Sequence, residues 1–207
     1  VDPSRRPAVV EQGGLPPIIS LACSDDAKDV AVAVSTLRGL ASAPEARRPL
    51  VVAGALEALG LASSQHDDNV DIKREASAAV NCISLNEENK MDIAQSAESL
   101  GRVLDLVNDT DLPSLRQICG AVANLTENER THDAILKSQG SVHFLTSLWS
   151  VDDVALVREV ARALANLAAN HDAHDYFADD DVVLLATAAS ENIDAVVARF
   201  AADDGSD

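Results

Sequence analysis

A helix-like segment recurs along the chain at a regular spacing, and this repeat constrains the fold more than any other feature. Its copies span residues 75–83, 118–125 and 160–167, which are rich in Ala, Val, Leu and Ile. The spacing of about 42 residues is typical of helical solenoids, in which each unit buries its apolar face against its neighbours. No propeller blade would carry this helical periodicity, so the repeat predicts an all-α chain.

One period, residues 129–170, predicts three helices. A short helix is expected over residues 129–138 and ends at Gly140, because glycine suits the left-handed backbone at a helix stop. A second apolar stripe follows. The acidic pair 152–153 then suits the N-cap of a longer third helix, whose apolar residues over 157–168 recur at three and four and predict one buried face.

The same division applied to the whole chain predicts a single solenoid domain over residues 1–207. The five expected repeats are about 1–42, 43–86, 87–128, 129–170 and 171–207. The opening helix of the first repeat is degenerate, because Pro3 and Pro7 are poor residues for a helix interior. No apolar run reaches the roughly 18 residues of a membrane-spanning helix, so direct membrane insertion is not expected.

Two further patterns identify the type of solenoid. Gly or a small residue precedes a new apolar run at 14–21, 54–59 and 140–145, and two third helices end in similar segments at 122–126 and 164–168. These patterns resemble armadillo repeats over essentially the whole chain, and HEAT repeats, with two helices per unit, are the nearest alternative. The resemblance implies a right-handed superhelix whose third helices line a concave groove for an extended peptide or partner surface.

The resemblance also implies which side chains face that groove, because steps of four keep residues on one helix face. The candidate groove residues are Arg74, Arg116, Asn124, Arg158, Arg162, Asn166 and Arg199. Armadillo proteins of the importin-α type carry Trp four residues before the groove Asn, whereas this chain has Gly120 and Arg162 there. Without that aromatic cage for Lys and Arg stems, importin-like transport of basic cargo is the least favoured function.

Four arginines, Arg74, Arg116, Arg158 and Arg199, share one repeat position and are called the arginine ladder below. In a chain with 16 Lys and Arg against 34 Asp and Glu, they would form a basic stripe on an acidic solenoid. One interpretation is a groove that grips a carboxylate-bearing segment through guanidinium forks. The other is structural, because acidic residues precede these helices and each Arg can pair with a carboxylate of its own or the next repeat.

Composition and cysteine usage narrow the partners and the compartment. A net charge of −18 argues against binding to nucleic acid, which requires Lys and Arg to release counterions. Cys23, Cys82 and Cys119 stand among apolar neighbours at helical spacing, so we expect three buried, slowly reacting thiols in a reducing compartment. This favours the cytoplasm or nucleus and leaves an organelle open for a processed chain. Trp149 is expected in the core of a second helix.

The sequence contains no arrangement that predicts catalysis or metal binding. His171 and His174 share a helix face without a third ligand at a defined spacing, and no calcium-loop or catalytic-triad pattern stands out. We therefore expect no enzyme, no cofactor and no metal. The predicted function is a protein-interaction scaffold or adaptor that binds an extended partner segment, for example an acidic one, along the concave groove. The alternative is a structural subunit embedded permanently in a larger multiprotein assembly.

Overall fold

The computed structural model describes residues 5–106, 111–138, 141–149 and 151–170, which form twelve α-helices and no strand. The helices are α1 (Arg6–Glu11), α2 (Leu15–Ala22), α3 (Ala27–Ala41), α4 (Pro44–Val52), α5 (Ala55–Gln65), α6 (Val70–Ile83), α7 (Glu87–Gln95), α8 (Ala97–Asp105), α9 (Leu112–Thr126), α10 (Glu129–Lys137), α11 (Ser141–Ser147) and α12 (Val154–Ala168). They fall into four successive groups of three, so the all-α prediction with three helices per repeat is confirmed. The predicted repeat 171–207 lies outside the described residues.

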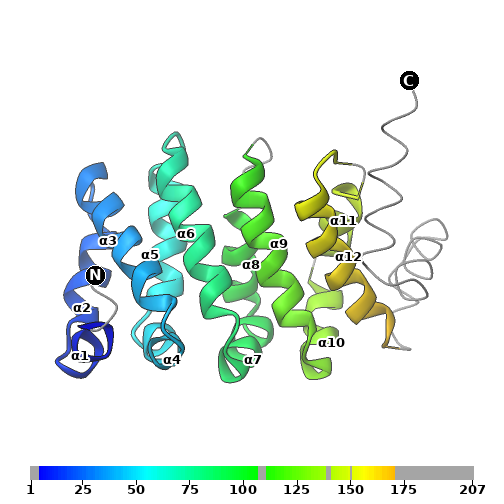
Figure 1. The fold of residues 1–207 in the computed structure, drawn as a ribbon, viewed down its shortest axis with the longest axis horizontal. Helices are drawn as coiled ribbons and strands as arrows, with labels where there is room; N and C mark the ends of the chain where they lie inside the picture. Colours follow the sequence, from blue (N-terminus) through cyan, green and yellow to red (C-terminus); the bar gives the residue numbers. More distant parts are fainter. Residues whose placement is uncertain (1–4, 107–110, 139–140, 150, 171–207) are drawn as a thin grey trace.

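The groups follow one another along the long axis of the molecule (Figure 1). The third helices α3, α6, α9 and α12 stand side by side, and each packs on the next. A continuous aliphatic core runs along the solenoid, and every third helix contributes buried side chains to it. Examples, one from each third helix, are Leu37, Val80, Val122 and Leu164. Because each repeat packs chiefly on its neighbours, the molecule is a solenoid and its long faces stay accessible.

Each third helix begins at a side-chain cap. Asp26, Asn69, Asp111 and Asp153 adopt extended backbone angles and accept hydrogen bonds from backbone N–H groups in the first turn of α3, α6, α9 and α12. Such caps satisfy donors that the helix itself leaves unpaired. The expectation that the acidic pair 152–153 supplies a cap is therefore confirmed, with Asp153 in that position.

One described turn between a first and a second helix uses a left-handed glycine, the type of helix stop that the sequence predicts at Gly140. Gly54 separates α4 from α5 and has φ of +91°, a left-handed conformation that costs little only for glycine. Gly140, the residue for which the sequence predicts this stop, lies outside the described residues. Gly54, at the equivalent place in another repeat, thus supports the rule that glycine suits the left-handed backbone at a helix stop.

The turn from a third helix to the next first helix is tied by a repeated hydrogen bond. A polar side chain of the first helix donates to a backbone carbonyl at the end of the preceding third helix. The three bonds are Arg47 Nε to Ala41 O at 3.1 Å, Asn89 Nδ2 to Ile83 O at 3.1 Å and Thr131 Oγ1 to Leu125 O at 2.6 Å. Because carbonyls at a helix end have no partner in their own helix, these bonds stabilise the corners that join neighbouring repeats.

The cysteine prediction is wrong in part. Cys119 in α9 is buried, and this burial, with a smaller contribution from Glu159, raises the pKa of its thiol to about 12. Cys23 is exposed because it caps the C-terminus of α2, beyond the last buried residue of that helix, and Cys82 is only partly buried. Trp149, which follows α11, is buried in the core as predicted.

Two further observations concern the described residues only. None of their helices is both long and apolar enough to cross a bilayer. Nor do they bring together three side chains among His, Cys, Asp and Glu in a group that could hold a metal ion.

Candidate functional site

The third helices α6, α9 and α12 together line a hollow of about 430 Å³, called the central hollow below. Its polar lining residues are Asn81, Arg116, Gln117, Asn124, Glu159 and Arg162. Its other lining residues are Cys82, Leu85, Gly120 and Ala155. Of the groove residues predicted from the sequence, Arg116, Asn124 and Arg162 thus meet at one place.

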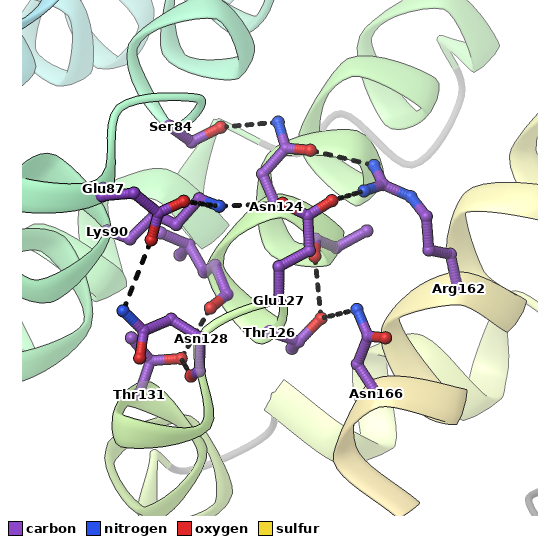
Figure 2. A network of polar contacts seen from close by, with 12 residues as sticks. Ser84, Glu87, Lys90, Asn124, Thr126, Glu127, Asn128, Thr131, Arg162 and Asn166 are labelled. Atoms are coloured by element: carbon purple, nitrogen blue, oxygen red, sulfur yellow. Dashed lines mark hydrogen bonds and ion pairs between the residues drawn. The ribbon is translucent and has the colours of Figure 1, made fainter. Parts of the chain in front are cut away.

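The remaining predicted groove residues lie elsewhere. Arg74 in α6, Arg158 in α12 and Asn166 in α12 belong to the third helices but do not line the central hollow. Asn166 is partly buried and donates from Nδ2 to Thr126 Oγ1 at 3.2 Å (Figure 2). Arg199 lies outside the described residues.

Gly120 explains why the hollow lies beside α9. A Cβ atom at this position would be 3.0 Å from Nδ2 and 3.3 Å from Oδ1 of Asn81, so any larger residue would require that amide to shift by a few tenths of an ångström. At the same repeat position α12 carries Arg162, one period further along the chain. The hollow is therefore found where α9 lacks the side chain that α12 has.

A chain of amide hydrogen bonds crosses the three helices beneath the hollow. Asn81 Nδ2 donates to Gln117 Oε1 at 2.9 Å. Asn124 Nδ2 donates to Asn81 Oδ1 at 3.0 Å. The same Nδ2 also donates to Ser84 Oγ at 3.0 Å, and Asn124 Oδ1 accepts from Arg162 Nη2 at 3.0 Å (Figure 2). Both ends of the buried Asn124 amide are thus occupied within the chain, and the network holds α6, α9 and α12 in register.

Arg162 also closes an ionic network on the far side of the hollow. Its Nη1 donates to Glu127 at 2.6 Å, and its Nε and Nη2 donate to Glu159 at 3.1 and 2.6 Å. Glu127 in turn accepts from the buried ammonium of Lys90 at 2.8 Å, which also donates to Glu87 (Figure 2). Burial opposes the charge on Lys90, but the hydrogen bonds to Glu127 and Glu87 outweigh it and raise the pKa of the ammonium.

The first two rungs of the arginine ladder connect successive repeats. Arg74 donates from Nε and Nη2 to Asp111 at 3.0 and 2.7 Å, and Arg116 donates from Nε to Asp153 at 2.9 Å and from Nη2 to the second oxygen. Both carboxylates also cap the next third helix, and their side chains are only 8% exposed. The hydrogen bonds from the arginines hold the pKa of both carboxyl groups below its usual value. For these two rungs the structure shows the pairing that the second interpretation of the ladder describes.

Comparison with known proteins identifies the fold. No protein-family model and no curated protein sequence matches the chain. A designed armadillo repeat protein in complex with the peptide (KR)4 superimposes with a TM-score of 0.74 over 90% of this chain and 85% of its own, at 19% identity. Computationally designed armadillo repeat proteins for modular peptide recognition give a TM-score of 0.73 with the same coverage and identity. The chain has an armadillo-like repeat fold.

An engineered protein superimposes on the chain with a TM-score of 0.74 and 26% identity, covering 93% of this chain and 84% of its own. The armadillo resemblance read from the glycine junctions and the third-helix endings is therefore confirmed for the fold. In this armadillo-like solenoid the central hollow lies on the face formed by the third helices, where the resemblance places a groove.

The armadillo-like repeats do not all carry a ladder rung. Arg74, Arg116 and Arg158 each stand five residues after the cap of their own third helix, and in α3 that position is Ala31. The cap of the following helix α6 is Asn69 rather than Asp, so arginine and carboxylate are missing together. Arg158 is exposed at the surface of α12, and the pattern of Asp followed five residues later by Arg recurs in the sequence at Asp194 and Arg199.

Sequence reasoning missed several residues that line the hollow, namely Asn81, Leu85, Gln117, Ala155 and Glu159. Gln117 directly follows the predicted groove residue Arg116, and Leu85 lies after the end of α6. Gly120 was noted only as the place of a missing Trp. A glycine in the middle of an apolar helix was the available signal, because such a glycine costs about 1 kcal/mol relative to Ala and therefore indicates a close approach.

Proposed function

We propose that this chain is a non-enzymatic protein-interaction scaffold that receives an extended partner segment along the face of α3, α6, α9 and α12. The observation that carries the proposal is the central hollow, which spans three consecutive third helices of a solenoid. Its volume of about 430 Å³ lies within the range of about 300–1,000 Å³ that is usual for ligand sites. The two designed armadillo neighbours described above, which recognise peptides on the same fold, support this proposal.

In this proposal the predicted groove residues have different functions. Asn124 and Arg162 form the floor and far wall of the hollow, where their bonds to one another keep its shape. Arg74 and Arg116 hold successive repeats together, yet their side chains stay 46% and 42% exposed and flank the path of the segment. Arg158, Asn166 and Arg199 would extend that path toward the C-terminal end.

Selection of peptide ligands tests the proposal. Random dodecapeptides displayed on phage are selected against the full chain, and the affinity of the winners is measured by fluorescence anisotropy. Leu85→Asp places a charge in the central hollow at a side chain that is 46% exposed, so the fold should tolerate it. We expect it to weaken binding by about tenfold or more, because truncating or charging a central contact has effects of this size.

Val52→Asp is the matched control. Val52 ends α4, is 72% exposed and does not line the hollow. It should leave peptide affinity unchanged, and both variants should keep the helical circular dichroism of the parent. Peptides that bind Leu85→Asp as tightly as the parent, or a failure to select any peptide, would contradict the proposal and favour a subunit embedded in a larger assembly.

A further inference from the structure

The ionic groups around the central hollow are already paired within the chain. Arg116 is held by Asp153, and all the hydrogen-bonding nitrogens of Arg162 are engaged with Glu127, Glu159, Asn124 and the Gly120 carbonyl. An incoming carboxylate would have to compete with an acceptor that is fixed in place by its own helix cap. An incoming Lys or Arg would compete with Arg162 for Glu159. A charged partner side chain therefore gains little here and loses its hydration.

The net charge of the chain also disfavours the binding of an acidic segment. The chain carries a net charge of −18, which disfavours the approach of anions, and this repulsion is strongest at low ionic strength because salt screens it beyond about 10 Å. The arginine ladder does not offset this repulsion at the hollow, since its rungs at Arg74 and Arg116 are neutralised by Asp111 and Asp153.

Two lining positions at the end of α6 are apolar where the following repeat is polar, whereas Asn81 is the polar lining residue of α6. Leu85 stands one period before Glu127, and Cys82 stands one period before Asn124. Leu85 is 46% exposed and is one of few large apolar side chains that the described residues leave open to solvent. Covering it with another aliphatic side chain would remove apolar surface from water, which is favourable by the hydrophobic effect.

The hollow also offers polar groups suited to a peptide backbone. Gln117 uses its carbonyl oxygen to accept from Asn81, while its amide N–H groups have no hydrogen-bond partner among the described residues. Those donors can pair with a carbonyl of an extended segment without disturbing the network that holds the helices. An apolar wall beside a neutral donor fits a segment that is uncharged at this position.

From these observations, and resting on the proposed function, we infer that the central hollow selects segments that place an aliphatic side chain between Leu85 and Gly120. The segment is extended, its backbone carbonyl accepts from Gln117, and its aliphatic side chain fills the space that Arg162 fills one repeat later. This assigns the hollow an apolar specificity that differs from the acidic ligand expected from the arginine ladder alone.

Cys82 provides a direct test, because its partly buried thiol lines the hollow while the exposed Cys23 lies on α2. The chain is equilibrated with disulfides of cysteamine coupled to N-acetyl-leucine, N-acetyl-aspartate or N-acetyl-lysine, in the presence of excess 2-mercaptoethanol. Under such exchange the fraction of each mixed disulfide reports the non-covalent affinity of the attached group. Peptide mass spectrometry then gives the labelled fraction at each cysteine separately.

We expect the leucyl probe to label Cys82 at least about fivefold more than the aspartyl or lysyl probe, while Cys23 shows no preference. Cys119 should stay unlabelled, since burial raises the pKa of its thiol to about 12. Leu85→Ser should abolish the preference at Cys82, whereas the control Val52→Ser should retain it. Gly120→Arg should reduce labelling of Cys82 by every probe, and Leu85→Ser remains informative if that variant does not fold.

Equal labelling of Cys82 by the three probes, no labelling by any, or a preference for the aspartyl or lysyl probe would each overturn the inference. An aspartyl preference would restore the carboxylate interpretation of the groove. The proposed function fails separately, when no selected peptide responds to Leu85→Asp. Peptides that respond to Leu85→Asp together with an aspartyl preference would keep the scaffold and reject only the aliphatic specificity.

Discussion

The junction between α3 and α6 and the junction between α9 and α12 join equivalent helices with different chemistry. α3 meets α6 through buried aliphatic and small side chains, and the one ion pair across it among the described residues, Arg38 with Glu75, is 3.5 Å long and largely exposed. α9 meets α12 through buried aliphatic side chains as well, and in addition through Arg116 with the cap carboxylate Asp153 and through the network centred on Arg162.

This difference shows that successive third helices can be joined either by apolar contacts alone or by apolar contacts together with hydrogen bonds and ion pairs. An apolar junction is stabilised by buried area, which changes little with pH or salt. A polar junction fixes the helices by directional bonds, and its stability depends on the charge state of carboxylates. The central hollow lies where the polar kind of junction begins, so its shape depends on those bonds.

Removing the cap carboxylates of α12 and α3, of which only the first also pairs with a ladder arginine, should give the largest difference. Asp153→Ala removes a cap of α12, which accepts from the Leu156 N–H at 2.8 Å, and also the partner of Arg116. Asp26→Ala removes only the exposed cap of α3. We expect losses of about 2 kcal/mol and about 1 kcal/mol respectively in the free energy of unfolding, measured by urea titration. Equal losses would mean that the rung contributes nothing.

Acid should act on the polar junctions through the same carboxylates. The pKa values of Asp111 and Asp153 are lower in the folded chain than the usual value of about 3.9, so their contribution is complete above about pH 4. It is lost as the pH falls through the lowered folded pKa values, because the unfolded chain then binds protons first.

The test replaces both residues by Asn, which also caps helices but does not titrate. We expect the parent to lose stability below about pH 4 more steeply than the double variant Asp111→Asn, Asp153→Asn, and the two slopes to coincide between pH 5 and 7. Urea unfolding at several pH values measures this. Parallel curves down to about pH 2 would show that the rungs do not carry the acid sensitivity.

A smaller difference is expected from neutral replacements of the two cross-junction arginines. Arg162→Met removes the donor to Asn124 Oδ1 and to Glu159, while Glu127 keeps its hydrogen bond from Lys90, and the change should cost about 1 kcal/mol. Arg38→Met breaks only the long, exposed pair with Glu75 and should cost less than about 0.5 kcal/mol. Thermal and urea unfolding measure both. A larger cost for Arg38→Met would show that the α3–α6 junction depends on its ion pair after all.

The fold could be predicted because the information that sets it is local and repeated. The repeat period follows from comparing similar segments along the chain, whereas the acidic cap at Asp153 and the glycine turn at Gly54 can each be read from a short stretch of sequence. The partly buried Cys82 and exposed Cys23 show the limit of that reasoning, because helical spacing indicates which face is apolar but not where the packed face ends.

The site was less predictable because its contacts join different repeats. Arg74 and Asp111 are 37 residues apart, less than one period, so their pairing depends on how successive third helices are offset. The arginine ladder could be seen in the sequence. Whether each arginine pairs with a carboxylate of its own repeat or of the next repeat could not be decided from it. The hollow depends on the Asn81 side chain packing against the backbone at Gly120 in the next repeat. No periodic pattern in the sequence encodes this contact.

The last and smallest contrast concerns a glycine in each region. A Cβ at Gly39 in α3 would meet nothing within 4 Å, whereas one at Gly120 in α9 would lie 3.0 Å from the Asn81 amide. Gly39→Ala should therefore stabilise the chain by about 0.5–1 kcal/mol, because alanine loses less backbone freedom in a helix. In Gly120→Ala the same gain is opposed by displacement of Asn81 from Gln117, so the net change should be close to zero or unfavourable. Urea unfolding of the two variants provides the measurement. Equal stabilisation would mean that Asn81 moves aside without cost, and that the amide chain beneath the hollow does not fix its shape.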